Sequence, residues 1–109
     1  MYKRQGEGGY LFASAPTLSS SDSVFRIDPT GIVESLKSTF GRPQGLAVDC
    51  HGVLHVVESL AGNSGIYQLA NDGRRTRVLA GPDLIGVAFS QNGDLAVASS
   101  ETIFRFNAT

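Results

Sequence analysis

The chain repeats itself at a spacing of 41 residues. The stretch Gly45–Val48 returns as Gly86–Phe89, and Gly52–Val56 returns as Gly93–Val97. Both landmarks keep the same offset, so the two copies are in register. A fixed period of this length indicates one structural unit that is built more than once.

A third, less regular copy comes first. Val24–Gly31 corresponds to Ile66–Gly73 at an offset of 42, and Gly9–Ala13 corresponds to Gly52–Val56 at an offset of 43. The first copy lacks an innermost strand by this alignment, and the last copy lacks an outermost one.

Glycine and proline divide the chain into intervals too short for an ordinary helix of about 11 residues. Short apolar runs of strand length fill these intervals, and turn sequences such as Asp49–Gly52 and Gln91–Gly93 separate them. Four short strands at a period near 40 residues are typical of propeller blades. The sequence therefore predicts an all-β fold, a partial β-propeller of two to three four-stranded antiparallel blades, at about residues 9–40, 43–81 and 82–109.

Composition excludes several classes of protein. Nine Lys and Arg against ten Asp and Glu give a net charge of −1, so we expect no nucleic-acid partner. No apolar run approaches the roughly 20 residues of a membrane span. One cysteine, Cys50, cannot form an internal disulfide or a thiolate metal cluster.

Both faces of the predicted strands carry mostly apolar side chains. Leu54 lies on one face of its strand, and His55 lies on the other face, where its counterparts are Phe12 and Ala96. A sheet that is covered on both faces has this pattern. The first and last blades would then each expose one apolar face. We expect the chain to pack against the rest of its own propeller, and to bind a hydrophobic dye or self-associate when isolated.

Residues 43–58, followed by 65–69 and the Asp72–Gly73 turn, resemble the NHL-repeat pattern P-x-G-[apolar]-A-[apolar]-D-x-x-G-x-L. At superfamily level the chain is similar to the six-bladed SMP-30/gluconolactonase/LRE-like propellers, in particular to the C-terminal part of bacterial gluconolactonase-like proteins. The N-terminal Met1–Gln5 resembles a translated sequencing adapter, so we assign the propeller to residues 6–109 and expect upstream coding sequence to be missing.

The resemblance implies a possible activity and cofactor. Gluconolactonase-like enzymes hold calcium or zinc at the channel mouth and hydrolyse sugar lactones. The family places Asp or Asn ligands between the Pro and Gly that open an inner strand, where this chain has Gln44 and Ile85. Ile85 cannot bind a metal and Gln44 is a weak neutral donor, so the sequence predicts no metal site within these blades. Whether the chain is catalytic stays open.

Four residues are candidates for ligand binding: Gln44, Asp49, Glu58 and Asn63. Asp49 has an alternative interpretation as the first residue of an Asp-x-x-Gly turn, and Glu58 as a carboxylate that bonds to a loop. Asn63 lies in a lengthened loop at the rim, a location that suits contacts with a ligand. His55 falls in mid-strand, where a side chain packed between blades is the simpler interpretation.

Two further clusters have plain explanations. The basic residues of Arg74–Arg77 open an outermost strand, where cations discourage edge-to-edge pairing, whereas a phosphate contact is the alternative. No Ser-His-Asp or Cys-His motif is recognisable, so catalytic residues stay unassigned.

The leading hypothesis is a binding module whose loops surround a central channel and bind a small molecule, a glycan or a protein. A metal-dependent lactone hydrolase and a structural scaffold are the alternatives. Localisation stays open, since periplasmic, extracellular and cytoplasmic placements all suit a chain with one cysteine.

Overall fold

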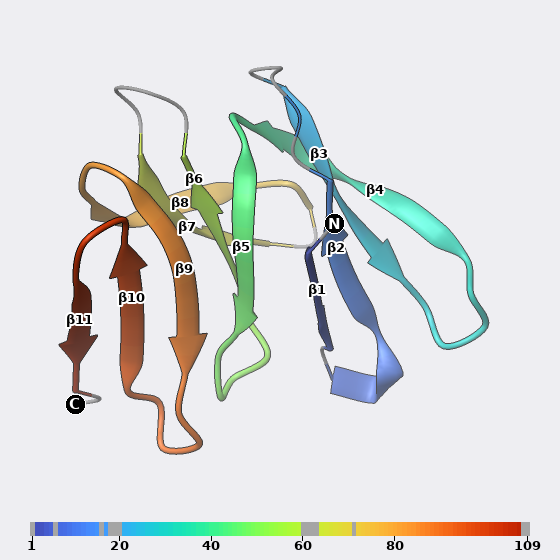
Figure 1. The fold of residues 1–109 in the computed structure, drawn as a ribbon. Coiled ribbons are helices and arrows are strands. Elements are labelled where there is room, and N and C mark those ends of the chain that lie inside the picture. The colour runs from blue at the N-terminus through green and yellow to red at the C-terminus, as the bar shows by residue number, and fades with distance from the viewer. Residues whose placement is uncertain are drawn as a thin grey trace.

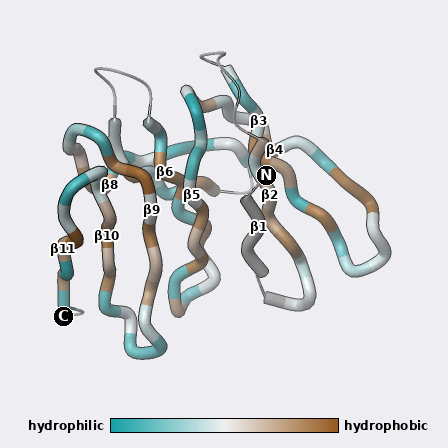
Figure 2. The backbone as a smooth tube through the Cα atoms, in the orientation of Figure 1, coloured by the Kyte–Doolittle hydropathy of each residue, from teal (hydrophilic) through white to brown (hydrophobic). Residues whose placement is uncertain are grey.

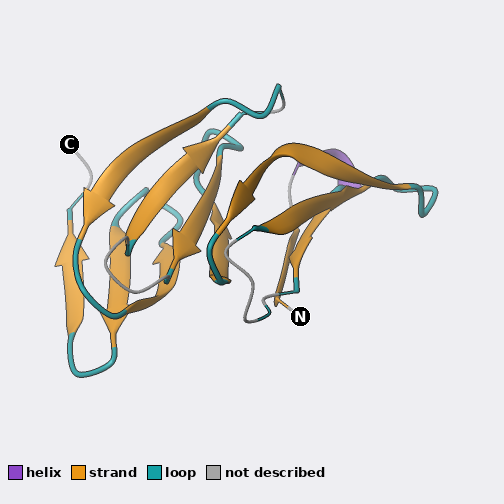
Figure 3. Ribbon diagram, turned by 90° about the horizontal axis from the view of Figure 1, so that it is seen from above, coloured by secondary structure: helices purple, strands orange, loops and turns teal. Residues whose placement is uncertain are grey.

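The computed structural model describes residues 2–5, 7–15, 17, 21–59, 64–70 and 72–107. These residues form three antiparallel sheets, in which neighbouring strands follow one another along the chain. The only helical segment in the described residues is one 3-10 turn at Glu7–Gly9 (Figure 3).

The first sheet contains β1 (Tyr2–Gln5), β2 (Leu11–Ser14), β3 (Asp22–Ile27) and β4 (Val33–Phe40). The second contains β5 (Pro43–Val48), β6 (Leu54–Glu58), β7 (Gly65–Leu69) and β8 (Arg75–Ala80). The third contains β9 (Leu84–Phe89), β10 (Leu95–Ser99) and β11 (Ile103–Phe106). The all-β prediction is confirmed, and the third sheet has three strands in the described residues, as expected.

The first strand of each sheet lies on the inside of the molecule. Figure 1 shows β9, β5 and β1 one after another across the middle of the view, and contacts join β1 to β5 and β5 to β9. A Cβ atom added to Gly45 on β5 would lie 3.3 Å from the carbonyl oxygen of Ile85 on β9. Glycine therefore allows the two inner strands to approach closely.

The second and third sheets share one hydrogen-bonding register. Gly45 pairs with Val57 in the second sheet, and Gly86 pairs with Ala98 in the third. Each partner is again 41 residues further along the chain. The sequence repeat therefore predicts which residues occupy equivalent places in two adjacent sheets.

The turns between the first two strands of these sheets follow the same chemistry. Gly52 and Gly93 have φ of 80° and 91°, which glycine adopts at little cost. The Gly52 N–H donates to the Asp49 carbonyl oxygen at 3.0 Å, and the Gly93 N–H donates to that of Ser90 at 3.1 Å. In Figure 2 the turn between β9 and β10 is hydrophilic and the adjoining strands are more apolar.

Two apolar clusters hold the three sheets together. One lies between the first and second sheets and the other between the second and third, so the middle sheet is covered on both faces. Val56 and Val57, neighbours on β6, are both fully buried and belong to different clusters. The fully buried hydroxyl of Ser14 donates to the Pro43 carbonyl oxygen at 2.8 Å and adds a polar link between the first two sheets.

The first sheet differs from the sequence-based expectation. The alignment predicts no inner strand there, and it sets Tyr2–Gln5 aside as foreign sequence, yet this segment forms β1. It pairs with β2 from Tyr2 opposite Ser14 to Gln5 opposite Leu11. Positive φ at Gly8 and Gly9 reverses the chain, so an extended segment reaches the unpaired edge of β2. The origin of the segment as an adapter stays a prediction.

Within the described residues, no helix is long and apolar enough to cross a membrane.

Candidate functional site

The candidate site is one end of the sheets, which we call the upper end. This upper end is where β5 and β9 begin and where β6 and β10 finish. The chain enters β5 through Arg42, with φ of 49°, and enters β9 through Asp83, with φ of 57°. A positive φ is uncommon for residues other than glycine and marks a constrained corner. The N–H of Ser59 donates to the Arg42 carbonyl oxygen, and that of Ser100 donates to the Asp83 carbonyl oxygen.

The carboxylate of Glu58 is buried at this end, with 6% of the residue exposed. It accepts a hydrogen bond from the Gly41 N–H at 2.8 Å, and its Oε2 lies 3.8 Å from Nη1 of Arg75. These contacts favour the interpretation of Glu58 as a carboxylate that bonds to a loop. A ligand-binding role for Glu58 stays a prediction.

Arg75 joins the first and second sheets. Its guanidinium lies over the rings of Phe40 and Tyr67, 4.8 Å and 4.7 Å from their centroids, and donates to the Thr39 carbonyl oxygen at 2.8 Å. A planar guanidinium suits this combination of stacking and hydrogen bonding. The sequence predicts an edge cation here, with a phosphate contact as the alternative, and gives no sign of this contact, because stacking partners from different sheets are not adjacent in the sequence.

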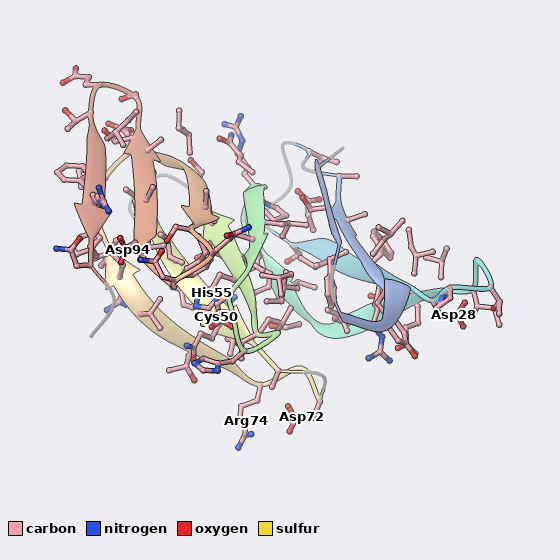
Figure 4. The ribbon with its side chains drawn as sticks, turned by 90° about the horizontal axis from the view of Figure 1, so that it is seen from below. Asp28, Cys50, His55, Asp72, Arg74 and Asp94 are labelled. Carbon is pink, nitrogen blue, oxygen red and sulfur yellow. The ribbon has the colours of Figure 1, made fainter. Side chains whose placement is uncertain are left out.

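The other basic residues of that cluster lie on the outside. β8 is the outermost strand of the second sheet, as expected, and the side chains of Arg74 and Arg77 are exposed. Arg74 Nε lies 3.9 Å from Asp72 Oδ2, at the turn labelled in Figure 4. Their placement suits a cationic sheet edge.

Gln44 and Ile85 occupy the same place in their sheets. Each is the extra residue of a bulge at the start of an inner strand. Gln44 is half-buried, whereas Ile85 is 44% exposed. The two positions are therefore equivalent, but at Ile85 the side chain is only hydrocarbon and cannot bind a metal ion.

Asp49 lies at the opposite end of β5. Its Oδ1 accepts hydrogen bonds from the N–H groups of His51 and Val53, at 2.9 Å and 3.0 Å. The Asp49 carboxylate is therefore a hydrogen-bond acceptor within the turn. The structure brings Gln44 and Glu58 to the upper end and separates Asp49 from them, while Asn63 lies outside the described residues.

His55 packs between the second and third sheets, in the manner that the sequence suggests. It is 4% exposed, and its ring meets that of Phe89 edge-on at 4.7 Å between centroids (Figure 4 labels His55). Burial lowers the pKa of His55 from its ordinary value of 6.5, and the hydrogen bond with the Val53 carbonyl and the charge of Asp49 oppose this shift. The pattern indicates a neutral core histidine.

These residues do not fit a divalent cation. Among the described residues, no group of three or more His, Cys, Asp or Glu side chains could hold a metal ion. At the upper end Ile85 has no donor atom, and Glu58 is occupied by Gly41 and Arg75. Calcium and zinc sites require several converging donors.

A groove that the sequence analysis did not identify lies between the crossover from β8 to β9 and the end of the third sheet. Its volume is about 460 Å³. Its apolar lining includes Leu79, Leu84, Phe104 and Phe106. The two phenylalanines are 47% and 44% exposed, which is unusual for large apolar residues on adjacent positions of one strand face.

The groove exists because the two groups that cover Tyr67 in the second sheet, one from each of the first two sheets, have no counterparts over the third sheet. Phe104 stands opposite Val97 as Tyr67 stands opposite Val56, so Phe104 and Tyr67 are equivalent. Phe40 and Arg75 cover Tyr67, but the residue 41 positions after Phe40 is Gly81, and no strand lies outside β11 in the described residues. In the sequence, the signal for this groove is the glycine at the position where the repeat would place a counterpart of Phe40.

The polar lining of the groove is acidic. Asp83 and Glu101 contribute carboxylates, both exposed, and Ser99, Ser100 and Thr102 surround them. None of the residues that line the groove is basic. The groove therefore combines aromatic rings with negative charge and suits a ligand that is apolar and cationic.

Comparison with known proteins supports the fold. No family model and no curated protein matches the chain. Among solved structures it is similar to a gluconolactonase from Xanthomonas campestris, with a TM-score of 0.77 and 20% identity over 96% of this chain and 42% of the other. Virginiamycin B lyase from Staphylococcus aureus gives a TM-score of 0.68 and 15% identity, over 95% of this chain and 39% of the other.

A quinonprotein alcohol dehydrogenase-like protein from Bacteroides thetaiotaomicron gives a TM-score of 0.67 and 15% identity, over 96% of this chain and 30% of the other. The chain forms three successive antiparallel sheets, and solved propeller proteins match nearly all of it. The two observations agree on the fold. The chain folds as part of a β-propeller. It spans less than half the length of each of these propeller proteins.

Proposed function

We propose that the chain is a binding module whose groove takes a small amphipathic cation, such as an aromatic or alkyl quaternary ammonium compound. The observation that supports this is the pairing of two half-exposed phenylalanine rings with two carboxylates in a groove of about 460 Å³. A cation over an aromatic face gains about 0.5–2 kcal/mol, and more as water is removed. The groove opens between loops of the upper end, where the sequence also predicts ligand contacts.

The test is an NMR titration of the chain with benzyltrimethylammonium. We expect saturable shift changes in the amides of the crossover at Gly81–Leu84 and of Ser99–Phe106, which line the groove. Phe104→Ala removes one ring, and Glu101→Gln removes one charge without changing the size of the side chain. Each variant should weaken binding several-fold.

Benzoate is the matched control ligand, because it has a similar ring and the opposite charge. Val78→Ala is the control variant, since Val78 is exposed on β8 and does not line the groove. Equal shifts with benzoate, or full binding by both Phe104→Ala and Glu101→Gln, would reject the proposal.

The second candidate is a contribution to a metal-dependent sugar-lactone hydrolase. Similarity in fold to the Xanthomonas campestris gluconolactonase favours it, and the family resemblance implies calcium or zinc as the metal. Because the described residues do not fit such an ion, most ligands would have to come from elsewhere. Hydrolysis of gluconolactone by the chain joined to the rest of its propeller, measured with and without added metal, tests it: a metal-dependent rate that falls in Gln44→Ala supports this function, and no rate rejects it.

The remaining predictions about function are unchanged. Partners are the rest of its own propeller together with a small molecule, glycan or protein, and a purely structural scaffold is the alternative. NHL-type repeats and a bacterial origin also stay predictions, because the similar structures are at most 20% identical.

A further inference from the structure

The first sheet has an apolar face that points away from the second sheet. Phe12 packs against the second sheet, so its neighbour Leu11 on β2 points the opposite way. Ile27 pairs with Leu11 and Val33 pairs with Ile27, which places all three on one face. Leu11 is 38% exposed and Val33 is 58% exposed. We call this the leading face.

The third sheet has the opposite free face. Val87 and Val97 pack against the second sheet, so Ala88 and Ala98 point away from it. Ile103 pairs with Ala98 and is 76% exposed, the largest exposure among the large apolar residues described. We call this the trailing face. The alanines of this face are small, and besides Ile103 it carries Arg105, which pairs with Ala96 and forms an ion pair with Asp94.

Each free face repeats a face that is already used inside the molecule. Leu11 and Ile27 pair with each other as Leu54 and Leu69 do, and Ala13 and Phe25 pair as Val56 and Tyr67 do. The leading face therefore corresponds to the side of the second sheet that covers the first, through the pairs Leu11 and Leu54, Phe25 and Tyr67, and Ile27 and Leu69.

The trailing face corresponds in the same way to the side of the second sheet that covers the third. Ala88 is equivalent to Ala47, and Ile103 is equivalent to Ile66. Ala47 and Ile66 are buried in the cluster between the second and third sheets. A trailing face and a leading face are thus the two halves of a contact that the chain already makes twice.

We propose that two copies of the 109-residue chain, when isolated from the rest of its own propeller, assemble head to tail, with the trailing face of each copy on the leading face of the other, to close a ring of six sheets. A contact between unlike faces either closes a ring or continues without limit. The chain matches 42% of the Xanthomonas campestris gluconolactonase, a propeller contained in one chain. Two is the whole number of copies that comes closest to one such propeller, which favours closure.

The experiment is light scattering during size-exclusion chromatography of the 109-residue chain over a hundredfold range of concentration. We expect a particle of twice the 11.5 kDa chain mass that dissociates on dilution. Ile103→Glu on the trailing face and Val33→Lys on the leading face should each give a monomer, since each side chain is largely exposed within one copy and its fold should persist by circular dichroism.

Mixing the two monomeric variants tests whether the trailing face of one copy meets the leading face of the other. One interface of the mixed pair has neither substitution, and the other brings a glutamate opposite a lysine, so the mixture should recover the dimer mass. Val78→Glu is the control, because Val78 lies outside both faces and should leave the dimer intact.

Three results would overturn the proposal. A parent chain that stays monomeric throughout the range shows that the faces do not join two copies. A mass that grows continuously with concentration shows open stacking. A variant mixture that stays monomeric shows that the two faces do not meet each other.

Discussion

At the scale of single residues, the turn glycines carry the most specific prediction. Gly52 has φ of 80°, whereas Gly81 has no positive φ and would place a new Cβ 3.6 Å from Leu84, an ordinary contact. Gly52→Ala should therefore lower the free energy of unfolding by about 1 kcal/mol, and Gly81→Ala should not. Urea denaturation at one fixed protein concentration measures both. Equal stability of the two variants would contradict the turn geometry.

His55 makes stability depend on pH. Burial lowers the pKa of His55 in the folded chain below 6.5, so in the interval beneath 6.5 the unfolded chain binds a proton that the folded chain does not. Stability is fully present above pH 6.5 and declines as the pH falls through the lowered pKa, below which this contribution levels off. His55→Phe, which places here the residue found at Phe12, should remove that decline.

His51→Gln is the matched control, because the His51 side chain is exposed in the turn. It should retain the pH dependence of the parent chain in urea denaturation between pH 7 and about 5. If the decline survives in His55→Phe, another group is responsible.

At the scale of elements, Glu58 fixes the crossover from β4 to β5. Glu58→Leu removes the acceptor for the Gly41 N–H and the anion beside Arg75, so it should lower the free energy of unfolding by about 1–3 kcal/mol. Glu58→Gln keeps a carbonyl oxygen at that place and should cost less. Thermal or urea unfolding ranks the two, and a larger loss in Glu58→Gln would contradict this role for the hydrogen bond.

The sequence predicted those elements whose signal is local or repeated. Gly45 and Gly86 were correctly placed in equivalent positions, because the turns and apolar alternation recur at one offset. The predicted blade at 9–40 requires an outermost strand, but the residues of β4 were not identified, since Val33 and its neighbours are exposed and give no clear alternation. β1 was missed because an extended segment pairs with an open strand edge whatever its origin.

The candidate site was harder to predict than the fold. Asp49 and Glu58 were recognised as polar residues at strand ends, but the sequence does not show which carboxylate the backbone already uses. The groove depends on a missing side chain at Gly81 and on the exposure of Phe104. Both are properties of packing between sheets that are distant in the chain.

At the scale of the whole molecule, the account depends on three sheets that succeed one another as equivalent blades. The two clusters between them are formed by opposite faces of the middle sheet, as this arrangement requires. The same equivalence defines the two free faces, and the groove lies where the equivalence fails, at Gly81 in place of a counterpart of Phe40. The ligand binding and the assembly that we propose are therefore separate consequences of one repeat.

The most direct test is a crystal structure of the 109-residue chain. We predict that Gly45 stands opposite Val57 and Gly86 opposite Ala98, in adjacent sheets that superimpose when the numbering is shifted by 41 residues. A structure in which these two pairs occupy unlike places, or in which the sheets are not neighbours, would contradict the account.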